Sequence, residues 1–433
     1  MAPLAILAGG GRLPLLIAES VASRGGAVHI VAIRGEAGPD IERHPHSWVN
    51  WGHIGRMLRV IKSHGGGNLV IAGHVARPDV MSFRPDLGLF RNVPAIARIL
   101  RSGGDNDVLT RVIAFFEQQG VTVKGVHEVA PELLALATPM APVPPPGIAG
   151  DIAIGARVLT ALADLDVGQA IVVADGHVVA IEGVDGTGRM LARLATSTLH
   201  NASGRRGVLV KAPKAGQELR VDMPAIGPET VSDTAAAGLT AIAIAAGQVL
   251  ILDRAELELR SHDSCVALYI LPLGIERREA IETKVFHLRQ CGRVMPTPAD
   301  MADIRTGVET TGRLVPFNTG AATAVVRGHV LAIAAAETFL AFAARVTQLR
   351  QWGSMRLPSP RGALVVRSGS AAGPLEINAL LPHIMEANLA GIAIVQTGDQ
   401  AHAIPASAIA DADTAGRFIV EARPPLFSRV GRP

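Results

Sequence analysis

Cysteine is scarce in this chain. Its 433 residues include only Cys265 and Cys291, and they are not spaced as a CxxC motif. This number and spacing support neither a disulfide framework nor a zinc site, and they are typical of a reducing compartment. Residues 1–20 have no basic segment before their apolar run and contain three successive glycines. We therefore expect no signal peptide and a cytoplasmic protein.

Charge is also sparse, because charged residues make up 18% of the chain and the net charge is +3. So small a net charge gives no general attraction for nucleic acid, and we expect no such partner. Between Asp233 and Asp253 no residue is charged, a stretch long enough to span a bilayer. Glycines interrupt this stretch, and alanine outnumbers leucine in it. We interpret it as buried strands joined by a tight turn, not as a membrane-spanning helix.

Aromatic residues are few, at 3% of the chain, whereas 46 residues are glycine. This composition favours an α/β protein whose helices and strands approach each other closely. The length exceeds what one hydrophobic core normally supports, so we expect two or three domains.

Residues 1–140 alternate short apolar strands with helical segments. The stretch LAILAGGGRLP combines a strand, a glycine loop and Pro14 at the expected first position of a helix, and three further short strands follow. This pattern predicts an N-terminal Rossmann-like domain with a parallel sheet. The amides of Gly9, Gly10 and Gly11 form a candidate anion site at the start of the helix. The loop is not a GxGxxG fingerprint, because Pro14 replaces its third glycine.

An internal repeat occupies the rest of the chain. The stretch GQAIVVADGHVVAIE begins at residue 168, and GAATAVVRGHVLAIA begins 152 residues later. Asp151 and Asp303 keep the same offset, as do Arg193 and Arg345. We therefore predict an α/β domain over 141–272, a connector over 273–295 and a repeat of that domain over 296–433.

The segment KAPKAGQELRVDMPAIG, residues 211–227, is the most polar loop of the first copy. Lys211, Lys214 and Arg220 match phosphate groups in charge. Asp222 supplies a carboxylate of the kind that holds Mg²⁺ together with substrate phosphate and water. The alternative is a solvated loop with surface ion pairs.

Strand ends of the N-terminal domain supply further candidates. His74 and Arg77 in AGHVARPD follow a strand at the edge where open α/β sheets bind ligands. Asp105 in SGGDNDVL precedes an apolar helical run, where it serves either as a helix cap or as a contact to metal or substrate. His74 has a structural hydrogen bond as its alternative role.

Seven of these motifs, in this order, resemble the UDP-2,3-diacylglucosamine pyrophosphatases of the LpxI type over residues 4–272; they are AGGGRLP, AGHVARPD, GGDNDVL, GVHEV, LDVGQAIVV, AIEGVDGT and KAPKAGQELRVDMPAIG. The resemblance implies a Rossmann-like domain and a distinct C-terminal domain with the lipid-linked UDP-sugar between them. It also implies Mg²⁺-dependent hydrolysis of UDP-2,3-diacylglucosamine to UMP and lipid X in lipid A biosynthesis. The acylated substrate implies transient contact with the cytoplasmic membrane surface, and a homodimer is left open.

The same resemblance assigns the site residues. Asp222 and Arg220 are the catalytic candidates, and Asp222, Glu182 and Asp105 are the metal candidates. The resemblance implies substrate binding at Gly9, Gly10, Gly11, Gln169, Lys211, Lys214 and Gln217, and the strand-end position described above adds His74 and Arg77. Asn106 and Gly188 each stand where the family has an acidic residue.

Two other functions remain open from the sequence. A non-catalytic UDP-sugar-binding protein would explain the losses at Asn106 and Gly188. A nicotinamide-dependent oxidoreductase would explain the Rossmann-like half but neither the broken fingerprint nor the polar loop.

The repeat has lost the polar residues of the first copy. Gln169 becomes Ala321, Glu182 becomes Ala334, and VRSGSAAGPLEINAL replaces the polar loop. We therefore expect the repeat to be degenerate, to bind no metal and to have a structural role, with a retuned lipid-binding function as the alternative.

Overall fold

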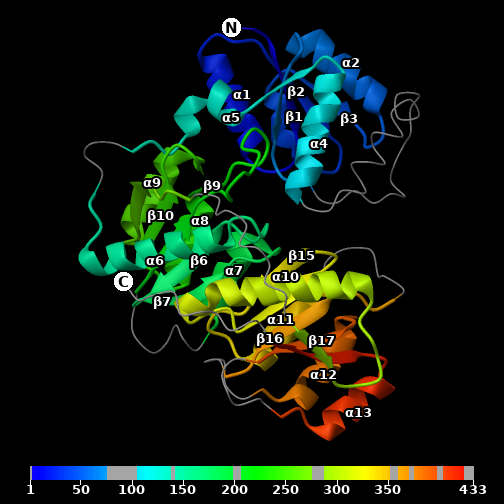
Figure 1. The fold of residues 1–433 in the computed structure, drawn as a ribbon. Helices are drawn as coiled ribbons and strands as arrows, with labels where there is room; N and C mark the ends of the chain where they lie inside the picture. The colour runs from blue at the N-terminus through cyan, green and yellow to red at the C-terminus, as the bar shows by residue number, and fades with distance from the viewer. Residues whose placement is uncertain are drawn as a thin grey trace.

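The computed structural model describes residues 2–75, 105–137, 142–197, 206–275, 287–351, 359–369, 375–396 and 403–423. Three α/β sheets follow one another along the chain, coloured blue to cyan, green, and yellow to red in Figure 1. The mixed α/β fold predicted from the sequence is confirmed.

The first sheet is fully parallel and has the strand order β3-β2-β1-β4-β5. Its strands are β1 (Leu4–Ala8), β2 (Val28–Ile33), β3 (His46–Val49), β4 (Asn68–Ala72) and β5 (Thr122–Lys124). Its helices are α1 (Leu13–Ser23), α2 (Ile54–Gly65), α4 (Asp105–Gln118) and α5 (Val126–Val129).

Both faces of this first sheet are covered, because alternate residues of a strand point to opposite sides. Leu4 and Ile6 of β1 pack in one apolar cluster with α1. Ala5 and Leu7 pack in another with α2 and α4. The strand order changes direction at β1, where open α/β sheets bind their ligands at the carboxyl ends of the strands.

The second sheet has the order β12-β10-β8-β6-β7. It consists of β6 (Ala170–Ala174), β7 (His177–Ile181), β8 (Val208–Lys211), β10 (Ala241–Ala245) and β12 (Ala267–Leu271). Strand β6 is antiparallel to β7 and β8, whereas β8, β10 and β12 are parallel. The accompanying helices are α6 (Pro146–Leu162), α7 (Gly186–Ala195), α8 (Pro228–Ala236) and α9 (Arg254–Asp263).

The uncharged stretch between Asp233 and Asp253 contains β10, a turn and the short strand β11 (Leu250–Ile251), which pairs with β9 (Ala225–Ile226). Leu250 is fully buried in an apolar cluster of the first domain. None of the helices in the described part of the chain is long and apolar enough to cross a membrane.

The third sheet repeats the second and adds one strand, in the order β13-β18-β17-β16-β14-β15. Its strands are β13 (His287–Gln290), β14 (Ala322–Val326), β15 (His329–Ile333), β16 (Ala363–Arg367), β17 (Gly391–Val395) and β18 (Phe418–Arg423). Its helices are α10 (Pro298–Leu314), α11 (Phe339–Gln351), α12 (Ile377–Glu386) and α13 (Ala406–Thr414). Strand β13, which lies within the predicted connector 273–295, extends the far edge by pairing with β18.

Local details are repeated as well as the topology. The β6–β7 and β14–β15 hairpins each contain a register shift, after Val172 in one and after Ala324 in the other. The Asp151 carboxylate accepts a hydrogen bond from the N–H of Gly176 at 2.7 Å, and that of Asp303 accepts one from Gly328. Packing and turn residues therefore survived duplication.

Phe342 in α11 is fully buried in the core of the repeat, whereas Leu340 on the same helix is 49% exposed. Phe342→Ala should lower the free energy of unfolding by about 3–5 kcal/mol, because it leaves a large cavity. The matched change Leu340→Ala should stay within about 0.5 kcal/mol. Urea unfolding followed by circular dichroism measures both, and equal effects would show that the repeat lacks a core of its own.

Candidate active site

A cavity of about 310 Å³ lies where the first two domains meet. The first domain contributes the glycine loop and the end of β4, including Gly10, Gly11 and His74. The second domain contributes residues 219–223 of the polar loop, with Arg220 and Asp222 among them. The cavity thus lies at the carboxyl ends of β1 and β4, where the sheet order changes direction.

The glycine loop is held against the end of β4 by backbone contacts. Gly10 and His74 exchange two backbone hydrogen bonds, of 2.7 and 3.0 Å, and the N–H of Gly9 donates to Ala72. A Cβ at Gly9 would lie 2.3 Å from the carbonyl oxygen of His74, and one at Gly73 would lie 2.5 Å from that of Gly10. The amides of Gly9 and Gly10 are therefore occupied in holding the loop. An anion at this loop would have to bind the amides that follow them.

Asp222 is oriented by a neighbour in its own loop. The amide Nε2 of Gln217 donates to Asp222 Oδ2 at 2.5 Å and to its backbone oxygen at 2.6 Å. The other side-chain atom of Gln217, Oε1, accepts from the N–H of Lys214 at 2.8 Å. Gln217 therefore positions the carboxylate that the sequence selects as catalytic.

Lys211 is buried at the end of β8, with 8% of its surface exposed. Its Nζ donates to Thr187 Oγ1 at 3.0 Å, and this hydroxyl donates to Glu182 Oε1 at 2.8 Å. Glu182 Oε2 accepts from the N–H of Gln169 at 2.5 Å. Burial lowers the pKa of Lys211, and the charges of Glu182 and Asp222 oppose that shift.

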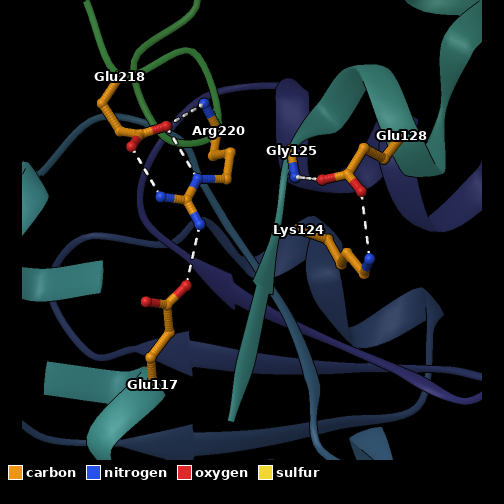
Figure 2. Close-up of polar contacts among 6 residues, drawn as sticks. All are labelled: Glu117, Lys124, Gly125, Glu128, Glu218 and Arg220. Carbon is orange, nitrogen blue, oxygen red and sulfur yellow. Dashed lines mark hydrogen bonds and ion pairs between the residues drawn. The ribbon is translucent and has the colours of Figure 1, made fainter. Parts of the chain in front are cut away.

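Arg220 connects the polar loop to the first domain (Figure 2). Its Nε and Nη2 atoms donate to the two carboxylate oxygens of Glu218 at 2.9 and 2.8 Å. Its Nη1 atom donates to Glu117 of α4 at 2.9 Å. The bidentate bond from Arg220 holds the pKa of Glu218 below its usual value, and the same bond raises the pKa of Arg220.

A second ion pair joins the two domains. Arg12, which follows the glycine loop, binds Asp253 at 2.8 Å. The sequence did not identify Glu117, Asp253 or Thr187 as part of the site. Their roles depend on contacts between segments far apart in the chain, and no motif marks them.

Several predicted residues lie away from the cavity or outside the described residues. Lys214 pairs with Asp166 at 2.7 Å. The residues of the Lys211 network do not line the cavity either, and Lys211 is linked to its wall only by the charge interaction with Asp222. Arg77 lies outside the described residues. Helix α4 begins at Asp105, whose side chain is also outside them.

Glu128 in the GVHEV motif has a structural role. Glu128 accepts from the N–H of Gly125 at 2.8 Å and pairs with Lys124 at 3.2 Å, as Figure 2 shows. It thus caps the short helix α5 rather than facing the cavity lining.

No group of three or more His, Cys, Asp or Glu side chains in the described residues could hold a metal ion. Mg²⁺ does not require such a group, because one or two protein carboxylates with substrate phosphate and water complete its shell. Asp222 at the cavity wall fits this requirement. The metal assignments of Glu182 and Asp105 stay predictions.

Comparison with known proteins agrees with this arrangement. Residues 3–133 match the LpxI N-terminal domain, and residues 140–269 match the LpxI C-terminal domain. The chain is 35% identical over 283 residues to the UDP-2,3-diacylglucosamine pyrophosphatase LpxI of Caulobacter vibrioides. The aligned region covers 64% of this chain and 99% of that relative. The chain belongs to the LpxI family. This confirms the resemblance inferred from the sequence, and the third sheet lies beyond the LpxI domain matches.

In this LpxI-family chain, the Glu218–Arg220 pair should make the polar loop sensitive to acid. Because the folded-state pKa of Glu218 is lowered, the pair stabilises the protein fully above the unfolded-state pKa, and this contribution is lost as the pH falls through the folded-state value. Between about pH 7 and about pH 3, Glu218→Gln should therefore lose less thermal stability than the wild type. Melting temperatures measured across this range give the comparison.

Glu256→Gln is the matched control, because Glu256 forms an exposed pair with Arg260 on α9. It should keep the acid sensitivity of the wild type. If Glu218→Gln also keeps it, the ion pair contributes nothing to stability.

Proposed function

We propose that this chain hydrolyses the pyrophosphate bond of UDP-2,3-diacylglucosamine to give UMP and lipid X, 2,3-diacylglucosamine 1-phosphate. One observation supports this most directly: Asp222 and Arg220 face the glycine loop across one cavity in a chain of the LpxI family. The relative from Caulobacter vibrioides carries that activity in its name. The reaction belongs to lipid A biosynthesis, and we propose that the chain acts as a hydrolase in the cytoplasm.

We further propose that the enzyme uses Mg²⁺, with Asp222 as the principal protein ligand and Glu182 and Asp105 as additional candidates. When bound, the ion would polarise a phosphate and lower the pKa of a water molecule. Gln217 prepares the site for this role by fixing the Asp222 carboxylate through two hydrogen bonds. A positioned ligand needs little reorganisation when charge develops in the reaction.

The cations of the site neutralise charge on the phosphoryl oxygens. Lys211 does not line the cavity, but it is a buried cation of the second domain whose charge acts on Asp222 at the cavity wall. Arg220 offers a planar fork that suits phosphate oxygens as well as the carboxylates it now binds. Since the transition state of phosphoryl transfer spreads charge over several oxygens, such cations stabilise it more than the ground state.

The proposed substrate carries acyl chains, which must lie on apolar protein surface or stay in the membrane. We therefore propose that the enzyme visits the cytoplasmic leaflet as a peripheral protein, using no membrane-spanning helix.

Release of UMP from UDP-2,3-diacylglucosamine tests the proposal. Turnover should require Mg²⁺, stop when EDTA is added and return when Mg²⁺ is restored in excess. Binding of the substrate without release of UMP would instead support a non-catalytic UDP-sugar-binding protein. Gly188 and Asn106, which replace acidic residues of the family, would then account for the loss of activity. Turnover that persists in EDTA would remove the metal from the mechanism.

Asp222→Ala should lower kcat by about a thousandfold, because a group that holds the metal or positions the phosphate stabilises the transition state more than the bound substrate. Substrate binding should change much less. Steady-state kinetics and isothermal titration with UDP-2,3-diacylglucosamine measure the two effects separately.

The repeat supplies control variants for this change. Glu376 is exposed, and Asn378 bonds to Ser407 and Asp411 within the repeat. Replacing both with Ala should leave hydrolysis within about a fewfold of wild type, as expected for surface polar groups away from a site. A loss comparable to that of Asp222→Ala would mean that both copies share the chemistry.

A further inference from the structure

The two copies of the repeated domain pack against each other through equivalent residues. Their shared apolar cluster contains both members of several pairs that are 152 residues apart. These pairs are Leu162 and Leu314, Leu165 and Phe317, Val173 and Val325, Val178 and Val330, and Ile181 and Ile333. Helices α6 and α10, which are also equivalent, pack together at this interface, as Figure 1 shows.

Polar contacts across the interface repeat this pattern. Arg313 in α10 donates from Nη1 to the carbonyl oxygen of Ala161, its own equivalent in α6, at 3.1 Å. The same guanidinium is buried and donates from Nη2 to Asp164 at 2.9 Å. A residue contacts its own equivalent only near the axis of a two-fold arrangement.

A group of four charges provides the same indication. Arg193 pairs with Asp185 in the first copy, and the equivalent Arg345 pairs with Glu337 in the second at 2.8 Å. The two pairs are close enough for the charges of Arg193 and Asp185 to act on Glu337. The repeat therefore occupies the position that a second copy of the catalytic domain would take in a symmetric dimer.

This interface reaches the segment that holds Lys211. The N–H of Val184 donates to the carbonyl oxygen of Leu331 in β15 at 3.1 Å. A Cβ added at Gly183 would lie 2.6 Å from that same oxygen. Gly183 and Val184 lie between Glu182 and Thr187. Thr187 accepts the hydrogen bond from the Lys211 ammonium group, and Glu182 accepts one from the Thr187 hydroxyl.

We propose that the repeat is a built-in partner subunit whose edge strand β15 positions the segment 182–187, and through it the ammonium group of Lys211. This role of the repeat rests on the proposed function, in which Lys211 acts on the substrate. The repeat contributes no group to the reaction. Its loss of polar residues fits this role, because a positioning partner must keep its packing surface but not its ligands.

Arg313→Glu in the full chain tests the proposal, because it places a negative charge beside Asp164 and Glu309 at the interface. Arg305→Glu is the matched control, since Arg305 is exposed on the same helix α10. Hydrogen exchange followed by mass spectrometry reports the protection of the Val184 amide. Kinetics with UDP-2,3-diacylglucosamine report kcat and KM separately.

Arg313→Glu should speed exchange at Val184 and lower kcat by about tenfold, the range typical of groups that orient an active-site residue. KM should change much less, because Lys211 acts mainly on charge that develops in the transition state. Arg305→Glu should match the wild type in both measurements. Faster exchange at Val184 with unchanged kcat would overturn the proposal while leaving the proposed function intact.

Gly183→Ala provides a second variant if Arg313→Glu does not fold. The backbone of Gly183 is not in the left-handed region, so the added methyl group acts chiefly through its collision with Leu331. It should produce the same increase in exchange and the same fall in kcat. If the wild type itself releases no UMP, the proposed function fails, and unchanged exchange at Val184 in both variants would then refute the positioning contact independently.

Discussion

The buried ammonium group of Lys211 imposes the strictest requirement on this structure. A charged group removed from water is costly unless other groups bind it or oppose its charge. Here a hydroxyl accepts its hydrogen bond, and two carboxylates surround it at longer range. These partners come from a hairpin end, from the start of α7 and from the polar loop, so three segments must be placed correctly for one charge.

Because the site is buried, replacing one residue around Lys211 affects the hydrogen bonds of the others. Glu182 is 7% exposed and accepts hydrogen bonds from Thr187 and from the Gln169 amide. Loss of any one partner would leave a buried donor or acceptor unsatisfied, which typically costs about 1–3 kcal/mol. A site of this kind depends on a supporting structure more than an exposed cluster of charges does.

The sequence predicted much of the fold, because strands, glycine turns and the repeat are expressed locally. The glycines and the alanine content of the uncharged stretch predicted two strands joined by a turn. The structure contains β10, a turn and β11 there. The polar loop was identified by its many charged and polar residues, and residues 219–223 of it line the cavity.

The remaining features could not be predicted, because they depend on which distant segments meet. Arg220 was expected to face phosphate, yet in this structure its guanidinium binds Glu218 and Glu117, which lies in a helix of another domain. The hydrogen bond between Val184 and Leu331 similarly joins the turn before α7 to the edge strand β15. Local propensity carries no information about either contact.

The two ion pairs that join the first domains, Arg12 with Asp253 and Arg220 with Glu117, are both partly exposed. Exposed pairs of this kind contribute only about 0–1 kcal/mol each and weaken as salt increases. The burial of Leu250 in an apolar cluster of the first domain therefore contributes more than these pairs to holding the two domains together. The cavity between the domains has a volume of about 310 Å³, which is near the lower limit for pockets that enclose a drug-sized molecule. A nucleotide sugar with two acyl chains is larger than such a molecule, so the two domains would have to separate to admit it.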